Sequence, residues 1–100
     1  MTKLLDLITP GEVLEEEFMK PLNISQNQLA RDLDVPPSRV HAIVRGHRAI
    51  TADMALRLGK YFTTSAQMWL NLQSHYDLEL TERERWPQIK SRVHTFRVAS

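Results

Sequence analysis

The chain has 100 residues, 42% of them hydrophobic and 25% charged, with a formal net charge of +1 and no cysteine. This length and composition fit one compact domain with a modest core, and the lack of cysteine excludes disulfides, thiolate zinc sites and cysteine nucleophiles. No apolar stretch approaches the length of a membrane span, and the N-terminal stretch Met1–Ile8 has an acid in its apolar run and no small-residue cleavage site. The sequence therefore predicts a cytoplasmic protein with no signal peptide and no membrane association.

The first helix is predicted to begin at Thr9. Thr9 can cap the helix, Pro10 suits the first helical position, and Glu12 completes a capping box. Because the residue before a proline disfavours helical geometry, Pro21 ends this helix one or two residues earlier in the chain.

The second and third helices are separated by a tight turn. Ser25 followed by Gln28 is the strongest helix start in the sequence, and Asp34 occupies the turn, where a left-handed backbone is tolerable for Asp. The third helix starts at Pro36-Pro37, and Gly46 is its expected C-terminal cap. The apolar residues expected to face inward are Leu29, Ala30 and Leu33 in the second helix and Val40, Ile43 and Val44 in the third. These signals predict a helix-turn-helix over Ser25–Gly46.

Two more helices are expected after this pair. Thr51 can cap the fourth, and the fifth begins near Thr64 or Ser65. The stripe on the fifth helix is interpreted mainly as core, with part of it available for a dimer seam, and consists of Trp69, Leu72 and Tyr76. Five short helices with short loops predict an all-α fold.

The pattern weakens toward the C-terminus. We divide the chain into a helix-turn-helix domain over residues 1–80 and a tail over residues 81–100, in which Trp86-Pro87 interrupts any helix. The last part of the tail can form either a helical stripe of Ile89, Val93 and Phe96 or a short strand over 93–98, and the sequence leaves both open. Its role is likewise open between dimerisation and partial disorder.

Charge is unevenly distributed along the chain. Residues 12–17 contain four glutamates and no basic residue, whereas no carboxylate lies between Asp34 and Asp53. The basic and imidazole side chains in that second interval are Arg39, His41, Arg45, His47 and Arg48. A basic patch facing away from an acidic helix is the footprint of a nucleic-acid-binding protein, and a solvated charged face is the alternative.

The outer face of the third helix has the chemistry of a helix that reads DNA. It combines small residues, which allow close approach of the backbone to base edges, with hydroxyl and guanidinium groups that hydrogen-bond them. The predicted base contacts are Ser38, Arg39, Ala42 and Arg45. The side chains predicted to meet the DNA backbone, mostly near helix starts, are Ser25, Gln26, Asn27, His41, His47, Arg48 and Thr51.

The sequence gives no indication of catalysis. His41 and His47 lack the spacing and the neighbouring carboxylate or thiol of a metal site. The chain has three glycines and no phosphate-cradling loop, nucleophile–base pair or paired carboxylates. We therefore expect no enzymatic activity, no metal and no cofactor.

The segment Ile24–Thr51, reading ISQNQLARDLDVPPSRVHAIVRGHRAIT, resembles the helix-turn-helix of the phage-repressor type, the Xre or Cro/CI superfamily. The runs TPGEVLEEEFMKPLNIS, RGHRAITADMALRLGKYF and WLNLQSHYDL make the chain similar to the HigA/VapI antitoxins over about residues 8–80. This resemblance implies a five-helix phage-repressor-like fold with a recognition helix at about residues 36–45. It further implies a homodimer that binds a palindromic operator in its own promoter, represses its operon and neutralises a HigB toxin, an mRNA endonuclease of the RelE type.

Residue by residue, the resemblance puts Ser38, Arg39 and Ala42 where the superfamily's recognition helix meets bases. It puts Gln26 at the helix start that meets phosphate or the outer base pair. The glutamates of residues 12–17, most simply a solvated face, are in this setting a candidate contact for a basic RNase partner.

Two residues depart from the superfamily pattern. Pro36 stands where a Ser or Thr cap is usual, and Pro37 lacks an N–H that would otherwise meet a phosphate. These two prolines favour an alternative in which DNA binding has been lost, and two alternatives to the antitoxin and autorepressor stay open in all. One is a solitary Xre-type regulator without a toxin partner, and the other is a helical protein-interaction module that has lost DNA binding.

Overall fold

A computed structural model describes residues 7–98 of the chain; residues 1–6, which hold most of the N-terminal stretch assessed for a signal peptide, and residues 99–100 lie outside the described part. The helices are Pro10–Val13 (α1), Leu14–Met19 (η1, a π-helix), Gln26–Leu33 (α2), Pro37–Val44 (α3), Ala52–Phe62 (α4), Ala66–Glu84 (α5), Trp86–Ile89 (α6) and Lys90–Arg92 (η2, a 3-10 turn). Over the described range there is no strand, so the predicted all-α class is confirmed. Residues 7–98 contain six α-helices where five were expected.

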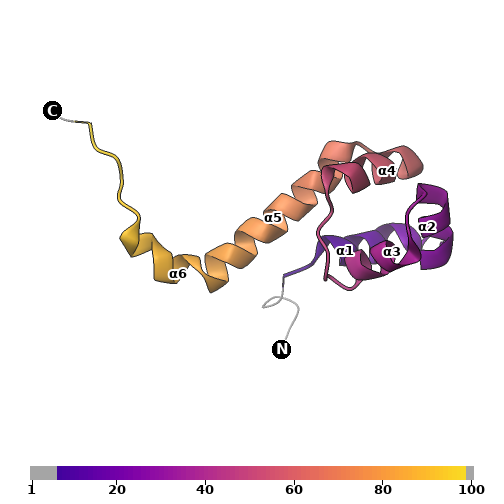
Figure 1. Ribbon diagram of the computed structural model, residues 1–100, viewed down its shortest axis with the longest axis horizontal. Helices are drawn as coiled ribbons and strands as arrows, with labels where there is room; N and C mark the ends of the chain where they lie inside the picture. The colour runs from indigo at the N-terminus through magenta and orange to yellow at the C-terminus, as the bar shows by residue number, and fades with distance from the viewer. Residues whose placement is uncertain (1–6, 99–100) are drawn as a thin grey trace.

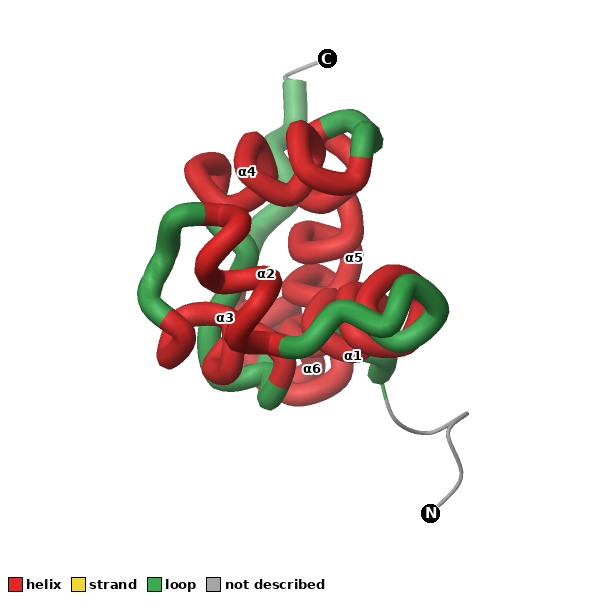
Figure 2. The backbone as a smooth tube through the Cα atoms, turned by 90° about the vertical axis from the view of Figure 1, so that its right-hand side faces the viewer, coloured by secondary structure: helices red, strands yellow, loops and turns green. Residues whose placement is uncertain are grey.

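The helices fall into two parts. Helices α1 to α4 gather at one end of the molecule, and α5 leads away from them toward the C-terminus (Figure 1). Helix α5 lies between α4 and α1 and packs against both (Figure 2). No helix within residues 7–98 combines the length and the apolar character that crossing a membrane requires.

The first helix begins as predicted and then widens. The Thr9 hydroxyl accepts a hydrogen bond from the N–H of Glu12, and the Glu12 carboxylate accepts one from the N–H of Thr9, both at 3.1 Å. From Leu14 onward the hydrogen bonds span five residues, as in a π-helix, rather than the four of the expected α-helix. This spacing puts Leu14 and Met19 on one face, and both are buried.

The turn between α2 and α3 also follows its local signals. The Ser25 hydroxyl accepts from the N–H of Gln28 at 3.0 Å, and Asp34 adopts the left-handed conformation with φ 61°. At the end of α3, Gly46 is left-handed with φ 79°. Its N–H donates to Ile43 and that of His47 to Ala42, the pattern of a Schellman cap.

We call the part of the chain from α1 to the start of α5 the body, and its hydrophobic core joins η1, α2, α3, α4 and the start of α5. The core comprises Leu14, Met19, Leu29, Ala30, Leu33, Val35, Val40, Ile43, Val44, Ile50, Met54, Ala55, Leu58 and Trp69. Gly11 allows α1 to approach α3 closely, because a Cβ there would overlap the Ile43 carbonyl. Position 11 therefore controls how α1 supports the back of α3.

Aromatic rings fix the start of α5 against the body. The ring of Trp69 is fully buried, and its centroid lies 4.8 Å from that of Phe18 and 6.2 Å from that of Phe62. The indole N–H donates to the Thr64 hydroxyl at 2.8 Å, so its one polar group is satisfied. On the predicted stripe of α5, Trp69 is core, whereas Leu72 and Tyr76 are only half-buried.

We call residues 81–98 the arm. Every residue of the arm except Ile89 is exposed, and the radius of gyration of the chain is 17.1 Å. A compact chain of this length would have a radius of about 13 Å, so the arm and the end of α5 extend from the body (Figure 1). The division at residue 80 falls inside α5, which continues to Glu84; an independent domain over residues 1–80 stays a prediction.

Trp86-Pro87 interrupts the helix as expected, but a new one begins there. Helix α5 ends at Glu84, and Pro87, which lacks an N–H to donate, stands in the first turn of α6. This restart provides the sixth helix. The alternatives for the end of the tail are both wrong, because residues 94–98 form neither helix nor strand.

Candidate nucleic-acid interface

The outward face of α3 brings together three of the four predicted base contacts. Ser38 and Arg45 are exposed and Ala42 is half-exposed between them. The opposite face is buried in the core and consists of Val40, Ile43 and Val44. The helix starts at Pro37 without a side-chain cap on Pro36, as the sequence predicts. The outward face therefore combines a small centre with a hydroxyl at one end and a guanidinium at the other.

Arg39 lies at the edge of this face rather than on it. Its side chain is half-buried, and its Nε is enclosed without a hydrogen-bond partner. The pKa of Asp53, in the first turn of α4, is lowered chiefly by its hydrogen bond with Arg57, and the positive charge of Arg39 lowers it further. A base contact by Arg39 stays a prediction.

The N-terminus of α2 is joined to α3 by one side-chain contact. Nδ1 of His41 lies 3.2 Å from Oε1 of Gln26, within hydrogen-bond distance. Gln26 is the first residue of α2, preceded by the cap Ser25 and followed by the exposed Asn27. Free backbone N–H groups at a helix start favour an anion. This contact therefore brings a phosphate-binding geometry next to the outward face of α3.

The loop after α3 carries the remaining predicted contacts. His47 and Arg48 are exposed directly after the Schellman cap, and Thr51 is exposed at the start of α4. The Thr51 hydroxyl accepts from the N–H of Met54 at 3.3 Å, so its first role is to cap α4. No carboxylate interrupts residues 35–52, so this surface is basic.

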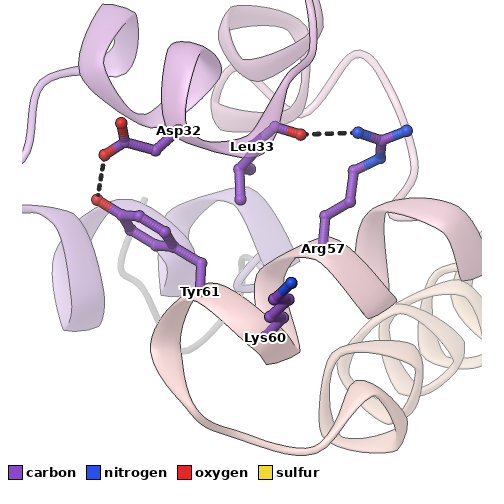
Figure 3. Close-up of a pocket in the computed structure, with 5 residues that line it drawn as sticks. All are labelled: Asp32, Leu33, Arg57, Lys60 and Tyr61. Atoms are coloured by element: carbon purple, nitrogen blue, oxygen red, sulfur yellow. Dashed lines mark hydrogen bonds between the residues drawn. The ribbon is translucent and has the colours of Figure 1, made fainter.

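Two interactions that support this surface were missed by sequence reasoning. Arg57 reaches from α4 to the end of α2, where Nη1 donates to the carbonyl oxygen of Leu33 at 2.7 Å (Figure 3). The same atom donates to the carbonyl oxygen of Asp34 at 3.2 Å. In addition, Oε1 of Gln73 on α5 accepts from the N–H of Ile50 at 2.8 Å. Both cross more than twenty residues of sequence. The one local signal is that Gln73 is a polar residue on the stripe of Trp69 and Tyr76.

The charges around Arg57 are paired with each other. Nε of Arg57 donates to Asp53 at 2.7 Å, and this hydrogen bond is the main reason why the pKa of the Asp53 carboxyl is lowered. The same bond raises the pKa of Arg57. On the other side of the hollow between α2 and α4, the Tyr61 hydroxyl donates to Asp32 at 2.7 Å, which raises the pKa of Tyr61 (Figure 3). These contacts link α4 to the end of α2 and hold the turn before α3.

Metal-binding side chains are dispersed. Among residues 7–98, His, Asp and Glu never gather in groups of three or more that could hold an ion. His41 and His47, which were considered as ligands, are exposed, and the partner of His41 is Gln26. The expectation that the chain needs no metal stays a prediction.

Comparison with known proteins defines the class. The helix-turn-helix family matches residues 16–69, which is more than half of the chain. The chain therefore belongs to the helix-turn-helix family. Virulence-associated protein I of Dichelobacter nodosus is 53% identical over 78 residues, covering 78% of this chain and 72% of that protein.

Solved structures narrow the class to antitoxins. The Pseudomonas aeruginosa antitoxin HigA, solved with the higBA promoter, is 47% identical with a TM-score of 0.86, covering 90% of this chain and 98% of that one. The antitoxin GraA in complex with its operator is 40% identical with a TM-score of 0.86, covering 91% and 92%. The predicted membership of the HigA/VapI-type antitoxins in the Xre superfamily is thus confirmed, and with it a non-enzymatic class.

Proposed function

We propose that the chain is a cytoplasmic antitoxin that represses its own operon, binding a palindromic operator as a homodimer with α3 in the major groove. The observation that carries this proposal is the outward face of α3, where exposed Ser38 and Arg45 flank the small Ala42. The His41–Gln26 contact adds a phosphate-binding helix start beside that face. The similar HigA and GraA proteins were solved with promoter and operator DNA.

Footprinting upstream of the chain's own gene at physiological salt tests DNA recognition. Protection of a palindrome is expected, and Arg45→Ala should weaken operator binding by about 1–3 kcal/mol if Arg45 reads a base. Arg92→Ala, which removes an exposed cation of the arm, is the matched control and should retain operator affinity. Shifts that are weak, sequence-blind and steeply salt-dependent would instead identify a protein-interaction module that has lost DNA binding.

A homodimer would place two copies of α3 about 34 Å apart in successive major grooves. The support for dimerisation is the arm, whose exposed apolar side chains are Trp86, Val93, Phe96 and Val98. Side chains of this kind, held away from the body, gain a partner when a second copy packs against them. Phe96→Glu should shift the chain to monomer in sedimentation experiments, whereas Leu56→Glu on α4, at a similarly exposed apolar position, should not. Unchanged dimerisation in the Phe96 variant would exclude the arm.

Neutralisation of a basic HigB/RelE-type toxin is the second half of the proposal. Its support is the acidic side of η1, where Glu16 and Glu17 are exposed. Co-expression with an adjacent small basic reading frame should yield a stable complex. Glu17→Lys should weaken that complex more than Glu82→Lys in the last turns of α5, which serves as the control. The absence of any complex with the neighbouring products would favour the solitary Xre-type regulator.

A further inference from the structure

The loop between α3 and α4 is held by few contacts. Its backbone is fixed at one end by the Schellman cap at Gly46 and at the other by the Thr51 cap of α4. Between these two points, in residues 48–50, the backbone makes one hydrogen bond, from the N–H of Ile50 to Oε1 of Gln73. This hydrogen bond is therefore the one that joins the backbone of residues 48–50 to α5, while the Ile50 side chain packs in the core.

Burial gives this bond its importance. Ile50 is 2% exposed, and its side chain belongs to the hydrophobic core. The Ile50 N–H lies in a partly buried position, where an amide needs an acceptor in place of the water it loses. Gln73 supplies that acceptor from a helix that is distant in sequence.

The orientation of the Gln73 amide is set by a second residue. Nε2 of Gln73 donates to Oδ1 of Asp77 at 2.9 Å, one helical turn further along α5. Because a carboxylate can only accept, the amide nitrogen must face Asp77 and its oxygen must face Ile50. The pair thus forms a directed chain of hydrogen bonds from Asp77 through Gln73 to the loop.

A pocket of about 220 Å³ lies beside the loop. Its lining includes His47, Arg48 and Ala49 from the loop, Gln73, Tyr76 and Asp77 from α5, and Thr9, Pro10 and Gly11 at the start of α1. The loop residues before Ile50 face this space, and beside it the Gln73 hydrogen bond joins the loop backbone to α5.

We propose that Gln73, oriented by Asp77, is a positioning residue that fixes the loop so that His47 and Arg48 meet a DNA phosphate. The inference rests on the proposed operator binding and adds the element that aligns its backbone contacts. It also gives α5, the helix that leads into the arm, a direct connection to the DNA-binding surface.

The test uses the full-length chain and two sets of substitutions. Gln73→Met keeps the size of the side chain and removes the acceptor. Gln73→Glu combined with Asp77→Asn rebuilds both bonds, since the glutamate accepts from Ile50 and from the new amide. Operator affinity is measured between low and physiological salt, and hydrogen exchange of the Ile50 amide is measured without DNA.

Gln73→Met should weaken operator binding about tenfold. It should also make the fall of log affinity with log salt shallower, with the magnitude of the slope smaller by about 1, as expected when one phosphate contact is lost. The Ile50 amide should exchange faster, and the paired substitution should restore both measurements. A merely structural role would not change the salt slope. Wild-type affinity and slope in the Met variant, or an unchanged Ile50 exchange rate, would overturn the assignment.

The two proposals fail in different ways. If the wild-type chain protects no palindrome, the proposed function is wrong whatever Gln73 does. If the wild type binds and the Met variant binds equally well, only the positioning role is wrong. Should Gln73→Met fold poorly, the comparison of Gln73→Ala with the paired change Gln73→Glu and Asp77→Asn decides the matter. The pair keeps the net charge and an acceptor for Ile50, so it should bind DNA better than Gln73→Ala, while equal loss in these two variants would exclude the tether.

Discussion

The body and the arm use similar residues in opposite ways. In the body, large apolar side chains from α1 to α5 are enclosed, as Leu58 and Trp69 are at 0% exposure. In the arm, Phe96 is 85% exposed and Val98 81% exposed. The chain therefore folds one part upon itself and leaves the other with apolar surface that a second molecule can cover.

This difference separates two kinds of stability. The body is stabilised by contacts within one chain, so its free energy of unfolding should not depend on protein concentration. Contacts made by the arm with a second copy would add stability that rises with concentration. Substitutions in the two regions can distinguish these contributions.

The largest effect is expected for Leu58→Ala, which leaves a cavity in the core of the body. It should reduce the free energy of unfolding by about 3 kcal/mol at any protein concentration.

The matching substitution in the arm is Phe96→Ala. It should leave the free energy of unfolding of the dilute chain unchanged and reduce only the increase of that free energy with protein concentration. Urea titrations at two protein concentrations measure both quantities. A concentration-independent loss in the Phe96 variant would mean that the arm packs on its own chain.

A smaller effect is expected for Gly11→Ala, where a new Cβ would overlap the Ile43 carbonyl. Forcing α1 away from α3 should cost about 2 kcal/mol in urea unfolding. The comparison variant is Gly46→Ala, whose nearest atom outside its neighbours is Thr9 Cγ2 at 3.6 Å and whose cost is the positive φ alone. That cost is about 1 kcal/mol. Equal losses in the two variants would show that α1 adjusts freely.

Two cap substitutions compare positions inside the body. Ser25 and Ser65 each accept a backbone hydrogen bond at 3.0 Å, at the starts of α2 and α5. Replacing either by Ala should cost about 1 kcal/mol of thermal stability. Only Ser25→Ala should also weaken operator binding, because α2 starts at the proposed DNA surface. An equal affinity loss in the Ser65 variant would trace the effect to stability instead.

The smallest effect is expected for Asp53→Asn. The pKa of Asp53 is below its ordinary value of 3.8, chiefly because of the Arg57 hydrogen bond. A carboxyl with a lowered folded-state pKa contributes stability above its unfolded pKa, and the contribution is lost as pH falls through the folded value. Wild type should therefore be slightly more stable than the variant at neutral pH, and the difference should shrink as the pH falls below 3.8 toward the lowered folded-state pKa. A difference that did not shrink as the pH was lowered through this range would contradict this account.

Local signals predicted the helix starts. Thr9, Ser25, Thr51 and Ser65 each cap a helix with a hydroxyl, because capping depends on residues within one turn. The same holds for Gly46 and for Asp34, whose left-handed conformations follow from residue type and position. The exposed face of α3 was predictable as well, because it lies opposite the apolar stripe that packs into the core.

The missed features depend on distant partners. Gln73 and Arg57 contact backbone atoms more than twenty residues away, which no local pattern encodes. Arg39 lies at the edge of α3, where a helical wheel does not determine whether a side chain is exposed or half-buried. The π-helix over Leu14–Met19 likewise satisfies packing in the assembled core rather than any propensity of its sequence.

The two prolines at the start of α3 have a thermodynamic consequence. Pro36 has φ −62° and Pro37 occupies the first turn, so two successive dihedrals are restricted in the unfolded chain and remain so in the folded one. A ligand docking here does not need to order this segment. Binding through α3 should then show little of the unfavourable entropy of coupled folding, and its heat-capacity change should follow the apolar area buried.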